Sequence, residues 1–505
     1  MKKVVYLPMD ERPCNMLFPS RLFGDAMMIR TPSALGNKKV PSDPEEVRGF
    51  LLTESRDADG LILSMDQLLY GGLIPSRLHY LDRETVMKRL DVIRQIKKEH
   101  PSLLIYAYQC IMRCPRYSSS DEEPDYYADC GREIYLLGDA RHRFRLGLCQ
   151  ENEVEEISGR VPQEALRDYL SRREFNLSFD LETLELVADG TIDFLVFPQD
   201  DSARYGFTAM DQEKIRKRIS DLHLGMKVLM YPGADELGLT MMSRILLHFC
   251  GKRPLVYVKT AATGSLMEMP PFEDRPLGET IKYHLIAAGC RMALSPSEAD
   301  IILGISYPGR NGRSGVVWPE SDPGYTVERN LAEFVLFLED TLERGKTVTL
   351  ADNAYANGGD PELISMLDQQ GMLSRLHGYS GWNTSSNTLG TAIAEGVHAL
   401  VVGMTQGHWD FLALRYLEDI CYDSVVRQQI TKDDLPKRGF DYFNVGEQRG
   451  EISELVRTHL LQAAKEFLPS IADQLVILDT WMPWSRMFEV GLSIRWNCPA
   501  EGPTI

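Results

Sequence analysis

The sequence predicts an α/β protein with a parallel (β/α)-barrel-like core and a C-terminal α+β addition; two doubly wound open sheets are the alternative. Short apolar runs of the kind found in strands buried on both faces of a parallel sheet recur along the chain. Amphipathic helical segments separate these runs, and this alternation favours right-handed βαβ units. About nine or ten strands are expected, which fits both architectures because a barrel needs about eight.

Six of the apolar runs end in a polar cluster that is usually acidic. Ligands of parallel sheets bind beyond the carboxyl ends of the strands, so these clusters predict one active-site face. The six segments are residues 4–12, 60–67, 192–201, 227–236, 347–360 and 377–387. Further strands are expected at residues 103–109, 255–259 and 300–306, with a weaker one at 27–30.

Between the strands, apolar residues recur at helical spacing and predict helices that cover the sheet. The clearest helices are expected at residues 83–100 and 326–344, with others at 391–396, 410–429 and 451–467. Residues 115–125 and 308–324 are rich in Ser, Pro, Gly and charge, which is typical of loops. The pattern changes after Trp409, and residues 488–496 favour a final strand. We therefore expect a (β/α)-type catalytic region over residues 1–410 and a C-terminal addition over 411–505.

The composition of the chain argues against several classes of partner and cellular location. The net charge is -18 and the pI is near 5.1, which argues against nucleic acid or an anionic membrane as a partner. No apolar stretch approaches the roughly 20 residues that cross a bilayer, and the first residues lack the apolar core of a signal peptide. Nine cysteines without regular spacing suit a reducing compartment. We expect a cytoplasmic protein; its oligomeric state cannot be read from the sequence.

Two carboxylate pairs are the candidate catalytic residues. Asp200 and Asp201 follow one predicted strand, and Asp235 and Glu236 follow the next. Two carboxylates near one site push their pKa values apart, which leaves one as an acid and the other charged, as glycoside hydrolysis requires. The alternative is that Asp201 and Asp235 cap the following helices. A cap needs only one acid, so the pairing favours chemistry.

Candidate substrate-binding residues lie in the first third of the chain. Asp10 and Arg12 close the first strand, and Asp66 closes the third. Tyr70 and Arg77 flank a double glycine that allows a tight turn. Carboxylates can bind vicinal hydroxyls and arginine can bind an anion, as a polar small-molecule pocket requires. Ion pairs of Asp10 with Arg12 or of Asp66 with Arg77, which would only tie loops together, are equally compatible with the sequence.

Two later segments add further candidates. ADNAYANGGD supplies Asp352, Asn353 and Asn357, whereas its Asp360, which precedes Pro361, is best explained as a helix N-cap. GWNTSSNTLG supplies an aromatic face for a sugar ring and amides for its hydroxyls, or alternatively a backbone nest for an anion. The residues from this segment are Trp382, Asn383 and Asn387.

Several familiar cofactor and nucleophile motifs are absent from the sequence. There is no GxxxxGK[ST] loop, no GxGxxG after the first strand, no GxSxG elbow and no HExxH helix. The histidines are scattered, and His408 beside Trp409 is expected to be solvated or packed rather than functional. We expect no cofactor and no dedicated metal ligands. An oxygen-only Mg²⁺ or Ca²⁺ site built from Asp10, Asp66, Asp200 and Asp352 is the alternative.

Six motifs in this order resemble the bacterial domain of unknown function family 4127. They are LPMDERP, DQLLYGGLIPSR, PQDDSARYG, PGADE, ADNAYANGGD and GWNTSSNTLG. The resemblance implies a bacterial origin and one module over the whole chain, but no activity. In addition, GADE is similar to the adjacent Asp-Glu of hexosaminidases that use the acetamido group of their substrate.

These observations lead us to expect a glycoside hydrolase that acts on small saccharides, with an N-acetylhexosaminide as a candidate substrate. Glu236 or Asp201 is the expected general acid, and Asp200 or Asp235 is the nucleophile or the residue that orients an acetamido group. Asp10, Asp66, Asn353 and Trp382 are expected to hold the sugar. The alternatives are a divalent-metal-dependent hydrolase or transferase that uses the same carboxylates, and a non-catalytic sugar-binding protein.

Overall fold

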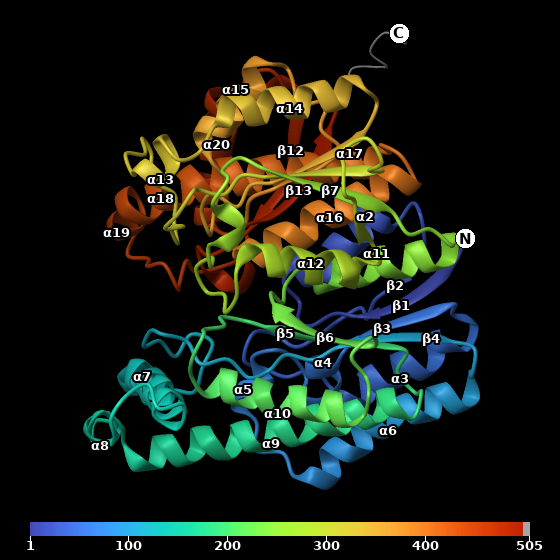
Figure 1. Ribbon diagram of the computed structural model, residues 1–505, viewed down its shortest axis with the longest axis vertical. Helices are drawn as coiled ribbons and strands as arrows, with labels where there is room; N and C mark the ends of the chain where they lie inside the picture. The colour runs from blue at the N-terminus through green and yellow to red at the C-terminus, as the bar shows by residue number, and fades with distance from the viewer. Residues whose placement is uncertain (498–505) are drawn as a thin grey trace. The chain divides into compact units, whose positions relative to one another are not determined.

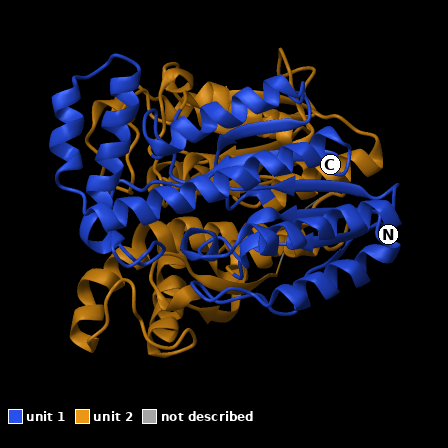
Figure 2. Cartoon of the chain, turned by 90° about the horizontal axis from the view of Figure 1, so that it is seen from below, with its two compact units in different colours: residues 1–11, 27–237, 272–274 blue, residues 12–26, 238–271, 275–505 orange. Residues whose placement is uncertain are grey.

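The computed structural model describes residues 1–497, which form two compact units. Unit 1 comprises residues 1–11, 27–237 and 272–274, and unit 2 comprises residues 12–26, 238–271 and the chain from residue 275 onward. Figure 2 colours the two units separately. Each unit contains its own parallel sheet.

The sheet of unit 1 has six parallel strands. They are β1 (Lys3–Leu7), β2 (Met28–Arg30), β3 (Gly60–Ser64), β4 (Leu104–Tyr108), β5 (Phe194–Gln199) and β6 (Val228–Pro232). Their spatial order is β2, β1, β3, β4, β5, β6. The central strands are buried on both faces, as where Val5 of β1 pairs with Leu61 of β3. Burial on both faces explains why these segments are apolar throughout and do not alternate.

Helices cover one face of this sheet. The helices of unit 1 are α3 (Pro44–Glu54), α4 (Met65–Tyr70), α5 (Pro75–Leu78), α6 (Arg83–Glu99), α7 (Tyr127–Arg145), α8 (Glu151–Ser158), α9 (Gln163–Ala188) and α10 (Phe207–Asp221). Figure 1 shows α3, α6, α9 and α10 along the sheet, and their apolar side chains share one core with the strands. Helices α7 and α8 pack with the start of α9 in a smaller core of their own.

The main sheet of unit 2 has five parallel strands. They are β7 (Leu255–Thr260), β8 (Arg291–Met292), β9 (Ile301–Ile305), β10 (Thr347–Ala351) and β11 (Tyr379–Ser380). Their spatial order is β8, β7, β9, β10, β11. Two later strands, β12 (Leu475–Trp481) and β13 (Gly491–Trp496), form a separate antiparallel pair.

Unit 2 also contains most of the helices. They are α1 (Pro13–Met16), α2 (Phe18–Phe23), α11 (Leu237–Cys250), α12 (Leu277–Ala288), α13 (Pro323–Thr326), α14 (Leu331–Glu343), α15 (Pro361–Gln369), α16 (Ser385–Val401), α17 (Gln406–Arg415), α18 (Arg427–Asp433), α19 (Leu435–Arg438) and α20 (Glu451–Phe467). A π-helical stretch, η3 (Tyr416–Val426), joins α17 to α18. Helices α12 and α16 share a core with β7 and β9, while α14 packs on β9 and β10.

The two sheets share one topology when the strands are counted within each unit. In each sheet, the second strand of the unit pairs with the first strand on one side. The third strand pairs with the first on its other side, and the later strands follow the third in order. The strand order therefore reverses between β1 and β3 in unit 1 and between β7 and β9 in unit 2. In doubly wound sheets, the crevice beyond the carboxyl ends at this reversal is the usual ligand site.

This topology corrects the expected barrel. A barrel grows by adding each strand on the same side until the last strand meets the first, whereas here the order reverses after two strands in each unit. Among residues 1–497, no strand pairing closes either sheet on itself. Two open α/β sheets, the alternative, are consistent with this arrangement. The expected division at residue 410 stays a prediction.

Most predicted elements lie where they were expected. The helix expected at residues 83–100 is α6, and the one expected at 451–467 is α20. The helix expected over 326–344 begins later, at Leu331, where Asn330 caps α14 by accepting a hydrogen bond from the backbone N–H of Glu333. The helix expected at 391–396 begins earlier, at Ser385, and the final strand begins at Gly491. None of the helices among the described residues is long and apolar enough to span a membrane.

Candidate functional site

The carboxyl edge of the unit 1 sheet gathers polar residues that follow four of its strands. Asp66 follows β3, Cys110 follows β4, Asp200 follows β5 and Asp235 follows β6. The Cys110 thiol lies within electrostatic range of all three carboxylates, so they belong to one region. This region lies at the ends of the parallel strands, where the fold places ligands.

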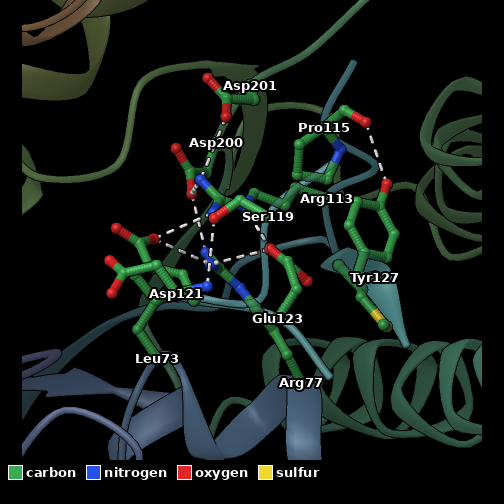
Figure 3. A network of polar contacts seen from close by, with 12 residues as sticks. Leu73, Arg77, Arg113, Pro115, Ser119, Asp121, Glu123, Tyr127, Asp200 and Asp201 are labelled. Atoms are coloured by element: carbon green, nitrogen blue, oxygen red, sulfur yellow. Dashed lines mark hydrogen bonds and ion pairs between the residues drawn. The ribbon is translucent and has the colours of Figure 1, made fainter. Parts of the chain in front are cut away.

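Two buried guanidinium groups, those of Arg77 and Arg113, occupy the centre of this region (Figure 3). Nη2 of Arg77 lies 2.7 Å from Oδ2 of Asp200, and Nη1 of Arg113 lies 3.0 Å from the same oxygen. Nη1 of Arg113 also lies 3.0 Å from Oδ2 of Asp201. One guanidinium therefore holds both aspartates of the predicted catalytic pair.

The loop at residues 115–125 encloses the arginines from another side. Oε1 of Glu123 lies 3.3 Å from Arg77 and 2.7 Å from Arg113, and Oε2 of Glu122 lies 3.2 Å and 3.0 Å from them. Lys38 forms an ion pair with Asp121 of the same loop. The segment expected to be a loop over the active-site face thus supplies charged residues to the network.

The backbone around the arginines is held from neighbouring elements. The Tyr169 hydroxyl on α9 donates to the carbonyl of Arg113 at 2.8 Å, and Arg173 donates to the carbonyl of Met112. Arg77 lies on α5, just after a turn at Gly71 and Gly72 with φ values of 87° and 143°. Glycine tolerates these values without a steric penalty, so the double glycine brings α5 back toward the strand ends.

Asp200 and Asp201 have different surroundings. Burial and the nearby charge of Asp200 raise the pKa of Asp201 to about 7, although Arg113 opposes this shift. Asp200 contacts both guanidinium groups, whereas Asp201 contacts that of Arg113. At neutral pH, Asp201 therefore keeps its proton in part of the molecules.

The backbone of Asp201 adopts an uncommon conformation. Its φ is +48°, in the left-handed region that non-glycine residues seldom occupy. The side chain does not cap the next helix, because the N-cap of α10 is Gly206. The capping alternative is therefore wrong for Asp201. The turn directs its carboxyl to Arg113 and leaves the side chain 18% exposed.

Asp66 and Asp10 lie at the strand-order reversal. Burial raises the pKa of Asp66 to about 6, although Oδ2 accepts a hydrogen bond of 2.9 Å from the backbone N–H of Cys110. Asp66 does not form the alternative ion pair with Arg77, whose guanidinium is bound by Asp200 and the loop glutamates. Asp10 follows β1 and is buried.

The second carboxylate pair is more enclosed than the first. Asp235 and Glu236 are both buried in the turn between β6 and α11. The Glu236 carboxylate folds back on Gly233, where a Cβ would lie 2.4 Å from its Oε1. Gly233 also has a φ of +115°, so only glycine fits here. Asp201, which is partly exposed, is thus a better general-acid candidate than Glu236.

The carboxyl edge of the unit 2 sheet uses its acid differently. Asp352 follows β10 and has no exposed surface. Its Oδ2 accepts hydrogen bonds from the backbone of Asp360 at 2.7 Å and from the Tyr379 hydroxyl at 2.8 Å. Burial and the nearby Asp360 raise its pKa to about 7. Asp352 therefore joins the loop after β10 to β11.

Asp360 is a helix cap, as expected. Its Oδ1 accepts a hydrogen bond from the backbone of Glu362, and Pro361 occupies the first turn of α15. Its Oδ2 lies 2.6 Å from the buried guanidinium of Arg329. Both carboxylate oxygens of Asp360 thus have structural partners.

The asparagines of this edge tie two loops together. Asn353 donates to the backbone carbonyl of Ser385 at 2.9 Å, and the backbone N–H of Asn357 donates to the carbonyl of Asn383 at 2.7 Å. Asn387 donates to the hydroxyl of Thr384 at the start of α16. The structure brings the ADNAYANGGD and GWNTSSNTLG segments together, with contacts that join the loops to each other.

Trp382 does not offer the exposed sugar platform that the sequence suggested. It is only 7% exposed, and its indole N–H donates to Thr391. Phe18 packs edge-on against the ring, and the guanidinium of Arg415 lies 5.4 Å from the ring centroid. Arg12, which also belongs to unit 2, lies 4.7 Å over the ring of Trp484. His408 is packed, as expected.

Sequence reasoning missed Arg113, Glu122 and Glu123. Arg113 lies a few residues beyond the end of β4, a strand that the sequence did predict. Its position just beyond the end of a predicted strand is the signal that could have identified it, because the acidic candidates were identified from the same kind of position. The glutamates lie in a segment recognised as a loop, but only the tertiary structure shows that they bind Arg77 and Arg113.

Within residues 1–497, no group of three or more His, Cys, Asp or Glu side chains is arranged to hold a metal ion. The family described as protein of unknown function DUF4127 matches residues 4–493, so the chain belongs to that family. No curated protein matches the chain.

Proposed function

We propose that this protein hydrolyses glycosidic bonds of small saccharides, with Asp201 as the general acid and Asp200 as the nucleophile. The observation that carries the proposal is the aspartate pair at the end of β5, whose members share one nitrogen of Arg113, while the pKa of Asp201 is raised to about 7. A pair of carboxyls with separated pKa values is the recurring requirement of glycosidases.

Asp201 suits the role of acid. Its pKa of about 7 leaves a proton available at neutral pH, and general acids work best when their pKa lies near the working pH. In the proposed first step, Asp201 gives its proton to the glycosidic oxygen as the bond from that oxygen to the anomeric carbon breaks. Its partly exposed side chain gives it access to a substrate.

Asp200 suits the role of nucleophile. Two guanidinium groups contact its Oδ2 and fix its orientation. Because Oδ2 of each aspartate lies 3.0 Å from the same nitrogen, these oxygens are closer than the roughly 6.5 Å at which inverting enzymes begin. The spacing supports retention, in which Asp200 bonds to the anomeric carbon and water then displaces it while Asp201 accepts the proton of that water.

The charge balance of the network supports the same chemistry. The two arginines are surrounded by Glu122, Glu123, Asp200 and Asp201, so carboxyls outnumber the cations that they bind. The transition state of glycoside hydrolysis resembles an oxocarbenium ion and carries positive charge. A site with excess carboxylate favours that charge.

The decisive experiment measures nitrophenol release from a panel of α- and β-linked nitrophenyl glycosides, including N-acetylhexosaminides, with and without EDTA. Asp201→Asn and Asp200→Asn are each expected to lower kcat/KM by at least about 10²-fold on the sugar that turns over. The matched control is Asp221→Asn, at the exposed end of α10, which is expected to keep full activity.

Three outcomes would count against the proposal. Turnover that both variants retain would remove the aspartate pair from the mechanism. Turnover abolished by EDTA would transfer the assignment to a metal-dependent enzyme. Saturable sugar binding by the wild type, without product from any glycoside, would indicate a binding protein. If turnover is found, the anomeric form of the first product, followed by NMR, tests retention directly.

A further inference from the structure

Helix α9 buries a polar stripe. The stripe comprises Tyr169, Arg172, Arg173, Asn176, Asp180 and Thr183, and all of these side chains are buried. The two arginines bind acids, since Arg172 pairs with Asp168 and Arg173 pairs with Asp211. Asp180 differs from the two arginines: it forms no ion pair within residues 1–497, and its Oδ1 has no hydrogen-bond partner there.

The neighbours of Asp180 fix the direction that it faces. One turn earlier, Asn176 donates to the carbonyl of Ser76 and bonds to His79. One turn later, Thr183 donates to Gln109 at the end of β4. Because residues three or four apart share a helix face, Asp180 lies between these two contacts and faces the strand ends.

Helix α4 presents two polar groups to Asp180. Asp66 and Tyr70 are four residues apart on this helix, and therefore share a face. Asp180 interacts electrostatically with Asp66, and the Tyr70 hydroxyl interacts with both carboxylates. Asp66, Tyr70 and Asp180, which we call the buried acid triad, are 2%, 3% and 2% exposed.

The members of the triad interact without touching. The structure has no hydrogen bond between any two of them, and the Tyr70 hydroxyl, like Oδ1 of Asp180, has no partner among the described residues. Leaving such buried polar atoms unsatisfied destabilises the folded state. Groups that are close enough to interact but too far apart to bond directly are commonly bridged by a small third species.

The charge of the triad indicates what that species is. It has two carboxyls and no cation of its own: neither Asp66 nor Asp180 forms an ion pair within residues 1–497, and the nearby Arg77 and Arg173 are bound to other acids. A buried carboxylate without a counter-charge is costly. A cation compensates two carboxylates, whereas a water molecule does not.

We propose that the buried acid triad binds one dehydrated monovalent cation, of the class of Na⁺, K⁺ or NH₄⁺, between Asp66, Asp180 and Tyr70. The triad is almost completely buried, which suits a small ion better than an organic ligand. Burial raises the pKa values of Asp66 and Asp180, which favours a single negative charge in the triad, and a monovalent ion matches one such charge. The cation would join α4 to α9 and fix Asp66 at the strand-order reversal.

The test compares unfolding temperatures at pH 8 in NaCl, KCl and NH₄Cl with those in choline chloride, whose cation is too large for the site, at one ionic strength. We expect at least one small cation to raise Tm by about 2 °C or more in a saturable way, as ligand binding to the folded state requires. An equal Tm in all four salts would overturn the proposal, because the triad would then hold protons or water only.

Variants separate a bound ion from a general salt effect. Tyr70→Phe should weaken the cation response, and Asp180→Asn should abolish it while melting no lower than wild type in choline chloride, because the amide removes the buried charge. The control Asp221→Asn should respond like wild type. An unchanged response in Asp180→Asn would contradict the assignment.

A crystallographic measurement on wild type avoids variants that fail to fold. Thallous ion replaces K⁺ and scatters anomalously, so crystals soaked in a thallous salt should show an anomalous peak between the three side chains. Full occupancy by a water molecule, with no anomalous signal, would overturn the proposal. Neither measurement uses catalytic activity, so failure of the glycosidase proposal would leave this one standing.

Discussion

Strands at the carboxyl edges of the two sheets are followed by similar acidic sequences, but the acidic side chains lie in different environments. In unit 1, Asp200 and Asp201 follow β5, contact arginines and keep part of their surface exposed. In unit 2, Asp352 follows β10, is fully buried, and accepts hydrogen bonds from a neighbouring loop and a tyrosine. An acidic tail after a buried strand thus leaves partly exposed carboxyls in one unit and forms a loop anchor in the other.

The contrast shows which property separates the two roles. Position at the end of a parallel strand is common to both, so it cannot distinguish them. The exposure of the side chain and the type of its partner do distinguish them. Asp201 is 18% exposed and bound to Arg113, whereas Asp352 is bound to backbone and tyrosine. Asp352 is fully buried, so a substrate cannot reach its Oδ1, which has no hydrogen-bond partner among the described residues.

The largest expected effect concerns the arginines of the two edges. Replacing Arg113 with Met should destabilise the protein by about 3–5 kcal/mol, because it leaves buried acids such as Glu123 with fewer counter-charges. Arg329→Met in unit 2 should cost less, since Arg329 has one close acidic partner, Asp360. Urea unfolding of both variants tests the order; a larger loss from Arg329→Met would contradict the comparison.

A smaller effect concerns pH and stability. The folded-state pKa of Asp352 is raised to about 7, above its unfolded value, so the folded state retains a proton that the unfolded state releases. Stability should therefore fall as pH rises from about 4 through 7. Asp352→Asn removes this titration and should stabilise the protein by about 1–3 kcal/mol at pH 8.

The matched measurement for this prediction is the pH profile of activity. Asp352→Asn should leave the profile unchanged, whereas wild-type kcat/KM should decline above pH 7 as Asp201 loses its proton. Melting temperatures and rates across the pH range give both readouts. A shift of the activity profile in Asp352→Asn would place Asp352 in the chemistry.

The smallest expected effect concerns Trp382. Trp382→Phe removes the hydrogen bond from the indole to Thr391 and some packing against Phe18, which should cost about 1 kcal/mol. KM for any saccharide substrate should remain within about twofold, because the ring is buried in unit 2. A large rise in KM with unchanged Tm would show that the tryptophan contacts the sugar.

Much of the fold could be predicted from local patterns. The helix at Arg83–Glu99 followed from its apolar stripe, and the strands at Leu104–Tyr108 and Ile301–Ile305 followed from their apolar runs. The capping role of Asp360 followed from the proline after it. These features depend on neighbours within one element, which the sequence displays directly.

The candidate site was predicted less completely. Asp200, Asp201 and Arg77 were identified from strand ends and a glycine turn, and the structure brings them together. Arg113 and Glu123 were missed, although they complete the network. Trp382 was expected to be exposed, because its neighbours in sequence are polar, yet Phe18 covers it from a segment far away in the chain.

The sequence by itself determined the α/β class, most strand and helix positions and the polar character of the strand ends, because periodicity and turn chemistry act over a few residues. The tertiary structure decided the strand order, because an apolar run does not specify which neighbouring strand it pairs with. The strand order in turn decided that the strands form two open sheets in place of a barrel. It also decided the roles of the acids. Burial and the approach of Arg113 or Tyr379 from distant segments set the charge and accessibility of each carboxyl, and these contacts exist only in the folded chain.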